Sequence, residues 1–291
     1  MKYFFSFFLS IFLLVPTTTF AAPVDYVGSA FKTTTKSYAV ITPEGEVLMG
    51  KNINSTLPIA SLTKLTSAMV LLDNGLDFEG VVAYDKEKHY AYRNYMKFAQ
   101  GDEIAVRDLW YSMLTGSMNI PVRMMVEYQG YTDEQFVGMM NEKARSLGLT
   151  ATEYYDVSGL DDRNVSNAFE ISRVLHAALQ YPEIADGLSR AHYSFEEVMS
   201  NNKSVKHYFT HTNILMRKKT SFDIVASKTG YTYEAGPCIA MQVVGSDGKA
   251  YYVVTLGESS YYKRYLEIPK LLSVMDLYVA TLRAQEYAIV R

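Results

Sequence analysis

Strand-like segments lie near both ends of the chain, and the sequence between them has helical periodicity. Residues 37–42 and 47–49 are short apolar runs that flank Pro43-Glu-Gly-Glu46, so they predict a β-hairpin. A second strand region begins near Ile224 and continues to residue 256 with a turn at 245–248. We therefore expect one sheet assembled from both ends of the chain, an inserted helical lobe, and a site in the cleft between them.

Several segments carry the periodicity and the end signals of helices. They are residues 63–72, 132–147, 170–179 and 269–282. Thr132 and Gln135 form a capping box at the start of the second segment. Pro269 is suited to the first turn of the last one, where its missing N–H is not needed.

The N-terminus has the order of a secretory signal peptide. Lys2 is followed by the apolar residues 3–15 and by small residues that end at Ala21. The apolar core is shorter than the ~18–20 residues that span a bilayer. We expect removal of residues 1–21 and a secreted, periplasmic or otherwise extracytoplasmic protein. Residues 22–291 are then expected to form a single domain whose helical subdomain covers roughly residues 77–215.

Composition and motif content exclude several classes of partner and cofactor. The net charge of −3, from 28 basic and 31 acidic residues, argues against nucleic acid. The sequence has no second long apolar run, so we expect no stable membrane anchor. His207 and His211 are four residues apart, but no further acidic or cysteine ligands complete a metal site. No phosphate-binding glycine loop occurs, so we expect no metal and no cofactor.

The strongest local signal for catalysis is Ser61-Leu-Thr-Lys64 at the start of a predicted helix. Three residues are nearly one helical turn, so the Lys64 amine can reach the Ser61 hydroxyl. A lysine whose pKa is lowered by burial or by a nearby cation can take the serine proton and make the oxygen nucleophilic. Taken alone, the pair fits an ordinary N-cap serine beside a solvated lysine better.

Two further short motifs change that balance. Ser117-Met-Asn119 follows a helix-like segment, and Lys228-Thr-Gly230 stands near the start of the second strand region. Each string is short enough to arise by chance. Together with Ser61 and Lys64, in this order and on these elements, they match the three motifs of penicillin-recognising serine enzymes.

On these motifs the chain resembles the low-molecular-mass penicillin-binding proteins of the D-alanyl-D-alanine carboxypeptidase family, of the serine peptidase S11 type. The strings at 139–149, 157–160, 164–166 and 211–213 resemble the D,D-endopeptidase branch in particular. The resemblance covers nearly all of the mature chain. It implies an α+β fold, with a five-stranded antiparallel sheet flanked by helices and an inserted helical subdomain. It also implies peptidoglycan stem peptides as substrate and β-lactam antibiotics as acylating inhibitors.

The resemblance gives the residues of the first two motifs roles in proton transfer. Ser61 would attack the carbonyl of the D-alanyl bond, and Lys64 would accept its proton. Ser117 would relay a proton to the leaving amine. Asn119 would hold Lys64 and the substrate amide.

The resemblance gives the third motif roles in binding and charge stabilisation. Lys228 would add positive potential that keeps Lys64 neutral, and Thr229 would bind the substrate carboxylate or side chain. Gly230 would let the substrate backbone approach the strand. The N–H groups of Ser61 and Tyr231 would form the oxyanion hole.

Two departures from the family pattern affect the middle motif. Met118 stands where a small residue is more usual. We expect its side chain to narrow the wall of the cleft at this motif or to make that wall more apolar. Ile120-Pro121 replaces a polar and small pair, although Pro121 can still start the next helix.

Other functions remain open for a chain with these motifs. A class A-like serine β-lactamase shares them but needs a deacylating glutamate in Glu-x-x-Leu-Asn, a string that does not occur here. Glu170 instead stands where a helix-starting acid is expected. A catalytically idle peptidoglycan-binding scaffold would keep the fold without turnover. Within the peptidases, the lack of room for a further domain and tail favours endopeptidase over carboxypeptidase. Lys263 and Arg264 are the nearby candidates for a carboxylate-binding cation.

Overall fold

The computed structural model describes residues 31–289 except 93–94, 200, 202 and 221, with side chains as far as Thr281. The predicted signal peptide and its cleavage site lie outside the described residues. Within the described ranges, no helix combines the length and apolar character needed to cross a membrane.

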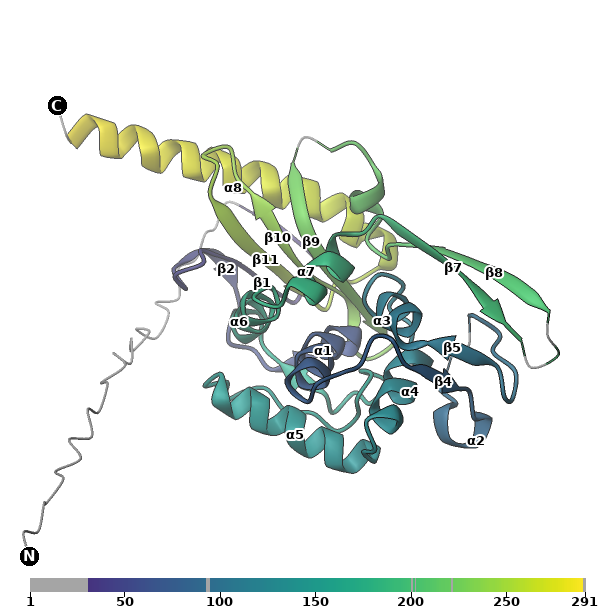
Figure 1. Ribbon diagram of the computed structural model, residues 1–291. Helices are drawn as coiled ribbons and strands as arrows, with labels where there is room; N and C mark the ends of the chain where they lie inside the picture. The colour runs from purple at the N-terminus through teal and green to yellow at the C-terminus, as the bar shows by residue number, and fades with distance from the viewer. Residues whose placement is uncertain (1–30, 93–94, 200, 202, 221, 290–291) are drawn as a thin grey trace, which may run out of the picture.

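A five-stranded antiparallel sheet has the order β2-β1-β11-β10-β9 (Figure 1). Its strands are β1 (Ser37–Ile41), β2 (Val47–Lys51), β9 (Asp223–Thr232), β10 (Gly236–Val244) and β11 (Ala250–Leu256). β1 pairs with β11 in the register Ser37↔Leu256, so the two ends of the chain meet in the sheet. The prediction of one sheet built from both ends is confirmed, and β9 lies at an edge.

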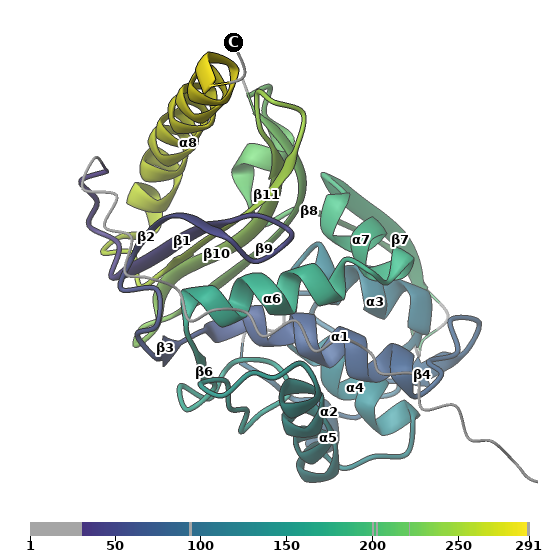
Figure 2. The same cartoon turned by 90° about the vertical axis from the view of Figure 1, so that its left-hand side faces the viewer.

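Helices cover both faces of this sheet. Val40, Met241 and Val253 point to one face and pack with α8 (Tyr261–Ile289). Their neighbours in the strands point to the other face and join the main core with α6 (Ala168–Ala178). Figure 2 shows α8 on one side of the sheet, and α6 and α1 on the other.

The C-terminal helix α8 begins earlier than the sequence predicts. Pro269 lies in its interior rather than in its first turn, so that part of the prediction is wrong. A proline inside a helix lacks the N–H for one helical hydrogen bond. Tyr265, Ile268 and Leu272, on both sides of it, are buried against the sheet. Their packing outweighs the local preference for a helix start at proline.

The remaining helices surround α1, which is buried along most of its length. Those that contact α1 (Lys64–Asp73) are α3 (Val106–Leu114), α4 (Ile120–Tyr128), α5 (Asp133–Ser146), α6 and α7 (Pro182–Ser189), whereas α2 (Lys86–His89) packs on α4. The predicted capping box is present, since the Thr132 hydroxyl accepts from the Gln135 N–H and the Gln135 amide accepts from the Thr132 N–H. The helices predicted over 63–72, 132–147 and 170–179 are therefore confirmed within a few residues.

The middle of the chain also contains strands, which the sequence analysis did not predict. A four-stranded sheet has the order β4-β5-β7-β8, and a short pair joins β3 to β6. These strands are β3 (Leu57–Pro58), β4 (Val81–Ala83), β5 (Glu103–Ala105), β6 (Val165–Ser166), β7 (His192–Val198) and β8 (Ser204–Thr210). Most are too short for a period to be recognised, and the β7–β8 hairpin is largely exposed, so its apolar pattern is weak.

Candidate active site

Ser61 lies in a 3-10 turn, η1 (Ala60–Thr63), that leads directly into α1. Ala60 has a left-handed φ of 47°, a conformation that costs energy for a residue with a Cβ. Two glycines allow other segments to approach this turn. A Cβ on Gly159 would lie 2.0 Å from the Ala60 carbonyl oxygen, and one on Gly230 would lie 2.8 Å from that of Ile59. Close packing on both sides therefore fixes the backbone around Ser61.

The Lys64 amine lies at the centre of a buried polar cluster. Its Nζ donates to Ser61 Oγ at 2.9 Å and to Asn119 Oδ1 at 2.8 Å. A third bond, of 2.5 Å, goes to the backbone carbonyl of Ser158. Burial lowers the pKa of Lys64 to about 7, although the negative charge of Asp156 opposes that shift. A lysine in this state exchanges its proton near neutral pH and touches the serine oxygen.

The carboxylate of Asp156 organises the loop that supplies the third contact to Lys64. It accepts hydrogen bonds from the N–H and hydroxyl of Ser158 and from the N–H groups of Gly159, Leu160 and Asp161. Sequence analysis did not identify Asp156 as a functional residue. An acid two residues before Ser-Gly is a turn signal that would have indicated its role.

Ser117 and Asn119 lie on the connection between α3 and α4. Ser117 has a left-handed φ of 58°, and its hydroxyl accepts a hydrogen bond from Lys228. Asn119 contacts Lys64 through its carbonyl and donates through its amide to the Tyr92 carbonyl at 3.0 Å. The two residues therefore connect the amines of Lys64 and Lys228.

Met118 does not form a wall of the cleft, contrary to the expectation from its size. Its side chain is buried in the protein and is not among the residues that line the cavity. The left-handed backbone at Ser117 presents residues 117 and 119 to the cavity while Met118 packs behind them. Pro121 lies in the first turn of α4, as expected.

Lys228 and Thr229 lie on the edge strand β9. Lys228 is fully buried, and its Nζ also donates to the Thr229 carbonyl at 3.1 Å. Burial lowers the pKa of Lys228 well below its ordinary value, and the positive charges of Lys64 and Arg264 lower it further. Thr229 Oγ1 donates to Thr212 Oγ1 at 2.6 Å. Thr212 was not identified from the sequence.

Of the two candidate cations near the end of the sheet, only Arg264 reaches the cavity. Its side chain is 2% exposed and donates to the carbonyls of Gly230 at 3.2 Å and Cys238 at 2.9 Å. Tyr265 accepts a further bond of 2.6 Å from Nη2. Lys263 is exposed and does not line the cavity.

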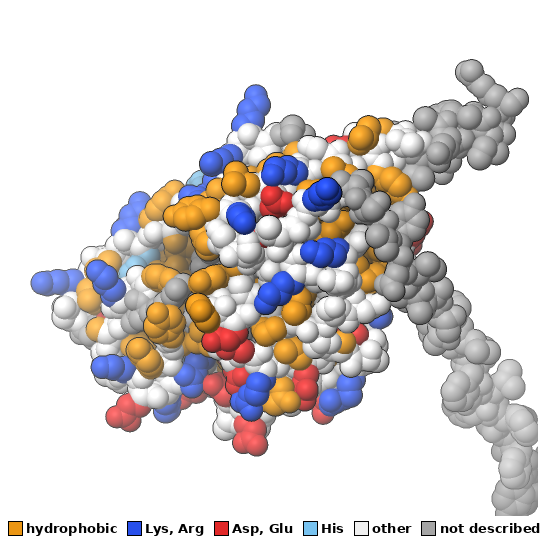
Figure 3. All heavy atoms as spheres, turned by 180° about the vertical axis from the view of Figure 1, so that it is seen from behind, with side chains coloured by type: hydrophobic (Ala, Val, Ile, Leu, Met, Phe, Trp, Pro, Cys, Tyr) orange, Lys and Arg blue, Asp and Glu red, His pale blue; other side chains and the backbone are white. Residues whose placement is uncertain are grey.

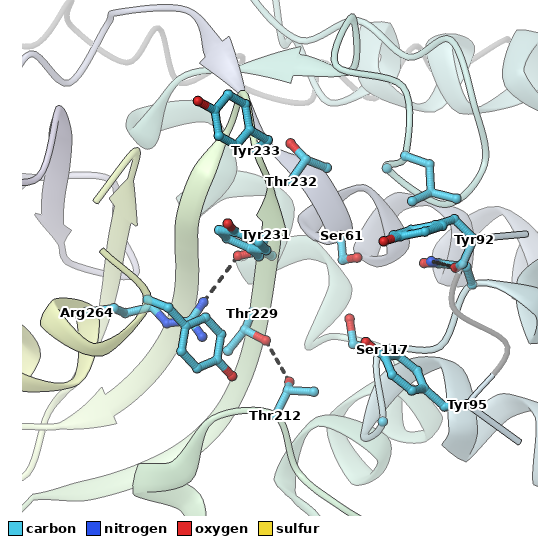
Figure 4. Close-up of a pocket in the computed structure, with 16 residues that line it drawn as sticks. Ser61, Tyr92, Tyr95, Ser117, Thr212, Thr229, Tyr231, Thr232, Tyr233 and Arg264 are labelled. Atoms are coloured by element: carbon cyan, nitrogen blue, oxygen red, sulfur yellow. Dashed lines mark hydrogen bonds between the residues drawn. The ribbon is translucent and has the colours of Figure 1, made fainter. Parts of the chain in front are cut away.

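These residues surround a cavity of about 580 Å³ between the sheet and the helical lobe. Figure 4 shows Ser61, Ser117 and Thr229 around the same space, with Tyr92 and Tyr95 across from Tyr231 and Arg264. Five of the lining residues are tyrosines, and no carboxylate is among the described residues that line it. The lining set is Ser61, Tyr92, Tyr95, Gly116, Ser117, Asn119, Gly159, Leu160, Thr212, Thr229, Gly230, Tyr231, Thr232, Tyr233, Tyr261 and Arg264.

Neither Glu170 nor any histidine is among the described residues that line this cavity. Glu170 accepts hydrogen bonds from the N–H groups of Thr150 and Ala151 and from the Thr152 hydroxyl. Across the described part of the chain, no group of three potential ligands could hold a metal ion. The polar side chains that line the cavity carry hydroxyls, the Asn119 amide and the Arg264 guanidinium.

Comparison with known proteins gives consistent similarities. A family model described as D-alanyl-D-alanine carboxypeptidase, Peptidase S11, matches residues 26–260. A D-alanyl-D-alanine endopeptidase of Pseudomonas aeruginosa is 32% identical over 79% of this chain and 74% of that protein. A D-alanyl-D-alanine carboxypeptidase of Bacillus subtilis is 29% identical over 78% of this chain, but over only 58% of its own length.

Two solved structures illustrate the similarity of fold. A Streptomyces K15 DD-transpeptidase has a TM-score of 0.75 at 20% identity, with 86% of this chain and 98% of that chain covered. Penicillin-binding protein D2 from Listeria monocytogenes, in its cefotaxime-bound form, has a TM-score of 0.69 at 25% identity. That match covers 84% of this chain and 98% of the Listeria chain.

Proposed function

Since the chain belongs to the D-alanyl-D-alanine carboxypeptidase family of serine peptidases, we propose that it cleaves D-alanyl bonds of peptidoglycan stem peptides through an acyl-enzyme on Ser61. One observation carries the proposal. The Ser61 hydroxyl is 2.9 Å from a buried lysine amine whose pKa is about 7. This pairing supplies an activated nucleophile at neutral pH.

Acylation then follows from the positions of the two motifs nearest Ser61. Lys64 Nζ takes the proton as Ser61 Oγ bonds to the carbonyl carbon of the substrate. The N–H groups of Ser61 and Tyr231 are proposed to hold the resulting oxyanion. Their proximity is supported by Gly230, whose Cβ position would be 3.1 Å from Ser61 N. When the C–N bond breaks, the leaving amine receives its proton through Ser117.

Hydrolysis of the acyl-enzyme reverses this proton path. Water gives a proton to Lys64 as its oxygen bonds to the ester carbonyl, and Ser61 Oγ leaves with a proton. Glu170 holds a loop outside the cavity, so it does not serve as the deacylating glutamate of class A-like β-lactamases. A penicillin acyl group is therefore expected to persist, and β-lactams are proposed to act as inhibitors.

The cationic end of the cavity favours an anionic group of the substrate. Lys228 and Arg264 are buried close together, and no described lining residue supplies a carboxylate to balance them. A bound carboxylate would stabilise the protonated form of Lys228 and reverse the depression of its pKa. We assign Thr229, Thr212 and Arg264 to this carboxylate, and Asn119 to the substrate amide.

The free edge of β9 is the proposed track for the substrate backbone. It is the terminal strand of the sheet, and Gly230 and Tyr231 on it line the cavity. An extended peptide can add to such an edge through main-chain hydrogen bonds. The acyl half of the substrate would then run along β9 past Tyr231.

We propose that cross-links are preferred over terminal D-alanine. The similarity to proteins named D-alanyl-D-alanine endopeptidase from Pseudomonas aeruginosa and Escherichia coli supports this preference. Arg264 is compatible with both reactions. A cross-link to the amine of a D-configured diamino acid also carries a carboxylate beside the scissile bond.

The location and partners are proposed from the same premise. Stem peptides lie outside the cytoplasm, in agreement with export and removal of residues 1–21. No nucleic acid, metal or cofactor takes part in the proposed reaction.

Labelling with a fluorescent penicillin tests the proposal. The mature protein is expected to acquire one acyl group, and Ser61→Ala is expected to acquire none while remaining folded, because only one hydroxyl is removed. Intact mass and circular dichroism measure the two properties. Stoichiometric acylation of Ser61→Ala would rule out Ser61 as the nucleophile, and an unlabelled wild-type protein would support an idle scaffold instead.

A further inference from the structure

Tyr233 is a tyrosine of the cavity wall that the proposed chemistry does not use. It follows the last residue of β9, and its side chain is 89% exposed. Figure 4 shows it at the opposite end of the pocket from Thr212. Because the exposed ring lines the cavity, it is available to contact a bound ligand.

The direction of the bound substrate determines which part of it meets Tyr233. Ser117 and the carboxylate-binding group around Thr229 and Thr212 lie toward one end of the cavity, where the leaving amine must be. The acyl half must therefore extend the other way, past Tyr231 and toward Tyr233. In peptidoglycan, this half of the stem peptide ends in its attachment to a sugar of the glycan strand.

The lengths agree with contact between Tyr233 and that sugar. A stem of four residues in extended form spans ~13 Å at ~3.3 Å per residue. Tyr233 is two residues beyond Tyr231 in the chain, in the turn that follows the last residue of β9. Its side chain adds several ångströms in reach.

The groups around Tyr233 suit a carbohydrate. The face of a tyrosine ring packs against the C–H face of a pyranose, whose hydroxyls need hydrogen-bond acceptors. Glu234 follows Tyr233 in the chain and is exposed. Asp162 lies close by, because its Oδ1 accepts a bond of 2.8 Å from the hydroxyl of Thr232. Tyr233 lines this end of the cavity, and the two acidic residues lie just outside the lining, where the sugar is expected.

We infer that Tyr233, with Glu234 and Asp162 beside it, forms a subsite for the glycan sugar of the acyl-donor strand. The inference rests on the proposed function and deepens it. Its substrate is a stem peptide still attached to glycan, and sugar-free peptides lose this contact.

Two matched substrates test the subsite. One is a cross-linked muropeptide dimer that carries its disaccharides, and the other is the same dimer after an amidase has removed the sugars. The wild-type kcat/KM is expected to be about tenfold higher for the sugar-bearing dimer, and Tyr233→Ala is expected to remove most of that ratio. Tyr208→Ala is the matched control. Tyr208 is 65% exposed on β8 and does not line the cavity, so the ratio should be unchanged.

The outcomes separate this inference from the proposed function. Fluorescent penicillin is applied first to every variant. Failure to acylate the wild-type protein would overturn the proposed function and the inference together. Normal acylation with equal kcat/KM for the two dimers would overturn only the sugar subsite. So would a loss of the same size on both dimers in Tyr233→Ala, because the ring would then contact the peptide.

Discussion

At the scale of single residues, the site contains two buried lysine amines that have different contacts and different proposed roles. Lys64 donates a hydrogen bond to Ser61, whereas Lys228 donates one to Ser117. Both amines are fully buried, and burial lowers the pKa of each. Asp156 lies on the Lys64 side and Arg264 on the Lys228 side, so the surrounding charges oppose the shift of one and reinforce that of the other.

The pKa of Lys64 predicts the pH dependence of acylation. Only the neutral amine can accept the Ser61 proton, and its pKa is lowered to about 7. Lowering the pH below 7 protonates the amine, so the single-turnover rate of penicillin acylation should fall about tenfold per pH unit and level off above about pH 8. Stopped-flow measurements from pH 5 to 9 check this profile. A rate that is flat across the range would contradict Lys64 as the base.

Asp156→Asn distinguishes an electrostatic role of Asp156 from a purely structural one. The carboxylate raises the pKa of Lys64, so its neutral replacement should lower that pKa and move the whole profile toward acidic pH. A variant whose only defect is a looser loop would have a lower acylation rate at the high-pH plateau, but the midpoint pH of the profile would not move. We expect both a lower plateau and a shifted midpoint, because the same carboxylate also holds the loop around Ser158.

Removing each amine in turn separates the base from the electrostatic partner. Lys64→Met should slow acylation by about 10³-fold or more, because Ser61 loses its adjacent acceptor. Lys228→Met should slow it less, by about tenfold to hundredfold, because its role is to supply charge and to hold Ser117. Single-turnover acylation at pH 8 compares them. A greater loss in Lys228→Met would reverse the assignment of the base.

At the scale of elements, the loop of residues 156–164 holds the turn that carries the nucleophile. Gly159 has a left-handed φ of 86°, and a Cβ there would clash with the Ala60 carbonyl. Gly159→Ala should therefore displace η1 and reduce acylation by more than tenfold. Gly130 has a similar φ of 83° but nothing within 4 Å of its Cβ position. Gly130→Ala introduces a similar strain of a left-handed backbone, but it should be acylated at the wild-type rate. Equal rates for both variants would show that the contact does not position Ser61.

The sequence predicts those elements whose local pattern and tertiary role agree. The helix capped by Thr132 and Gln135 and the strands of the main sheet belong to this class. Pro269 shows the opposite case, since a local start signal was overridden by the buried face of α8. The three motifs predicted residues that the fold brings together around one cavity. Thr212 acts through a contact with Thr229 on a distant segment, which spacing along the chain does not encode. Arg264 was a candidate from the sequence, but its contacts with the carbonyls of Gly230 and Cys238 could not be predicted.

At the scale of the whole molecule, the distribution of surface groups matters for the substrate. Figure 3 shows the molecule from behind, relative to Figure 1. On this face, hydrophobic side chains, a class that includes tyrosine, gather over the middle and one side, and most acidic groups lie toward the lower edge. The cavity opens between the sheet and the lobe, with tyrosines on both walls. A leaving group larger than one amino acid has aromatic surface available on the tyrosines that line the cavity, among them Tyr95 and Tyr261.

Substrate choice is the prediction that depends on this overall arrangement. We expect the mature protein to convert cross-linked muropeptide dimers into monomers faster than it releases D-alanine from pentapeptide monomers. A single D-alanine uses only the cationic end of the cavity, whereas a second stem can also pack on the tyrosine walls. Chromatography of parallel digests measures both products. Free D-alanine appearing while dimers stay intact would overturn the preference for cross-links. Because both reactions share the acyl-enzyme on Ser61, that result would leave the proposed chemistry unchanged and would confine the role of Arg264 to holding a terminal carboxylate.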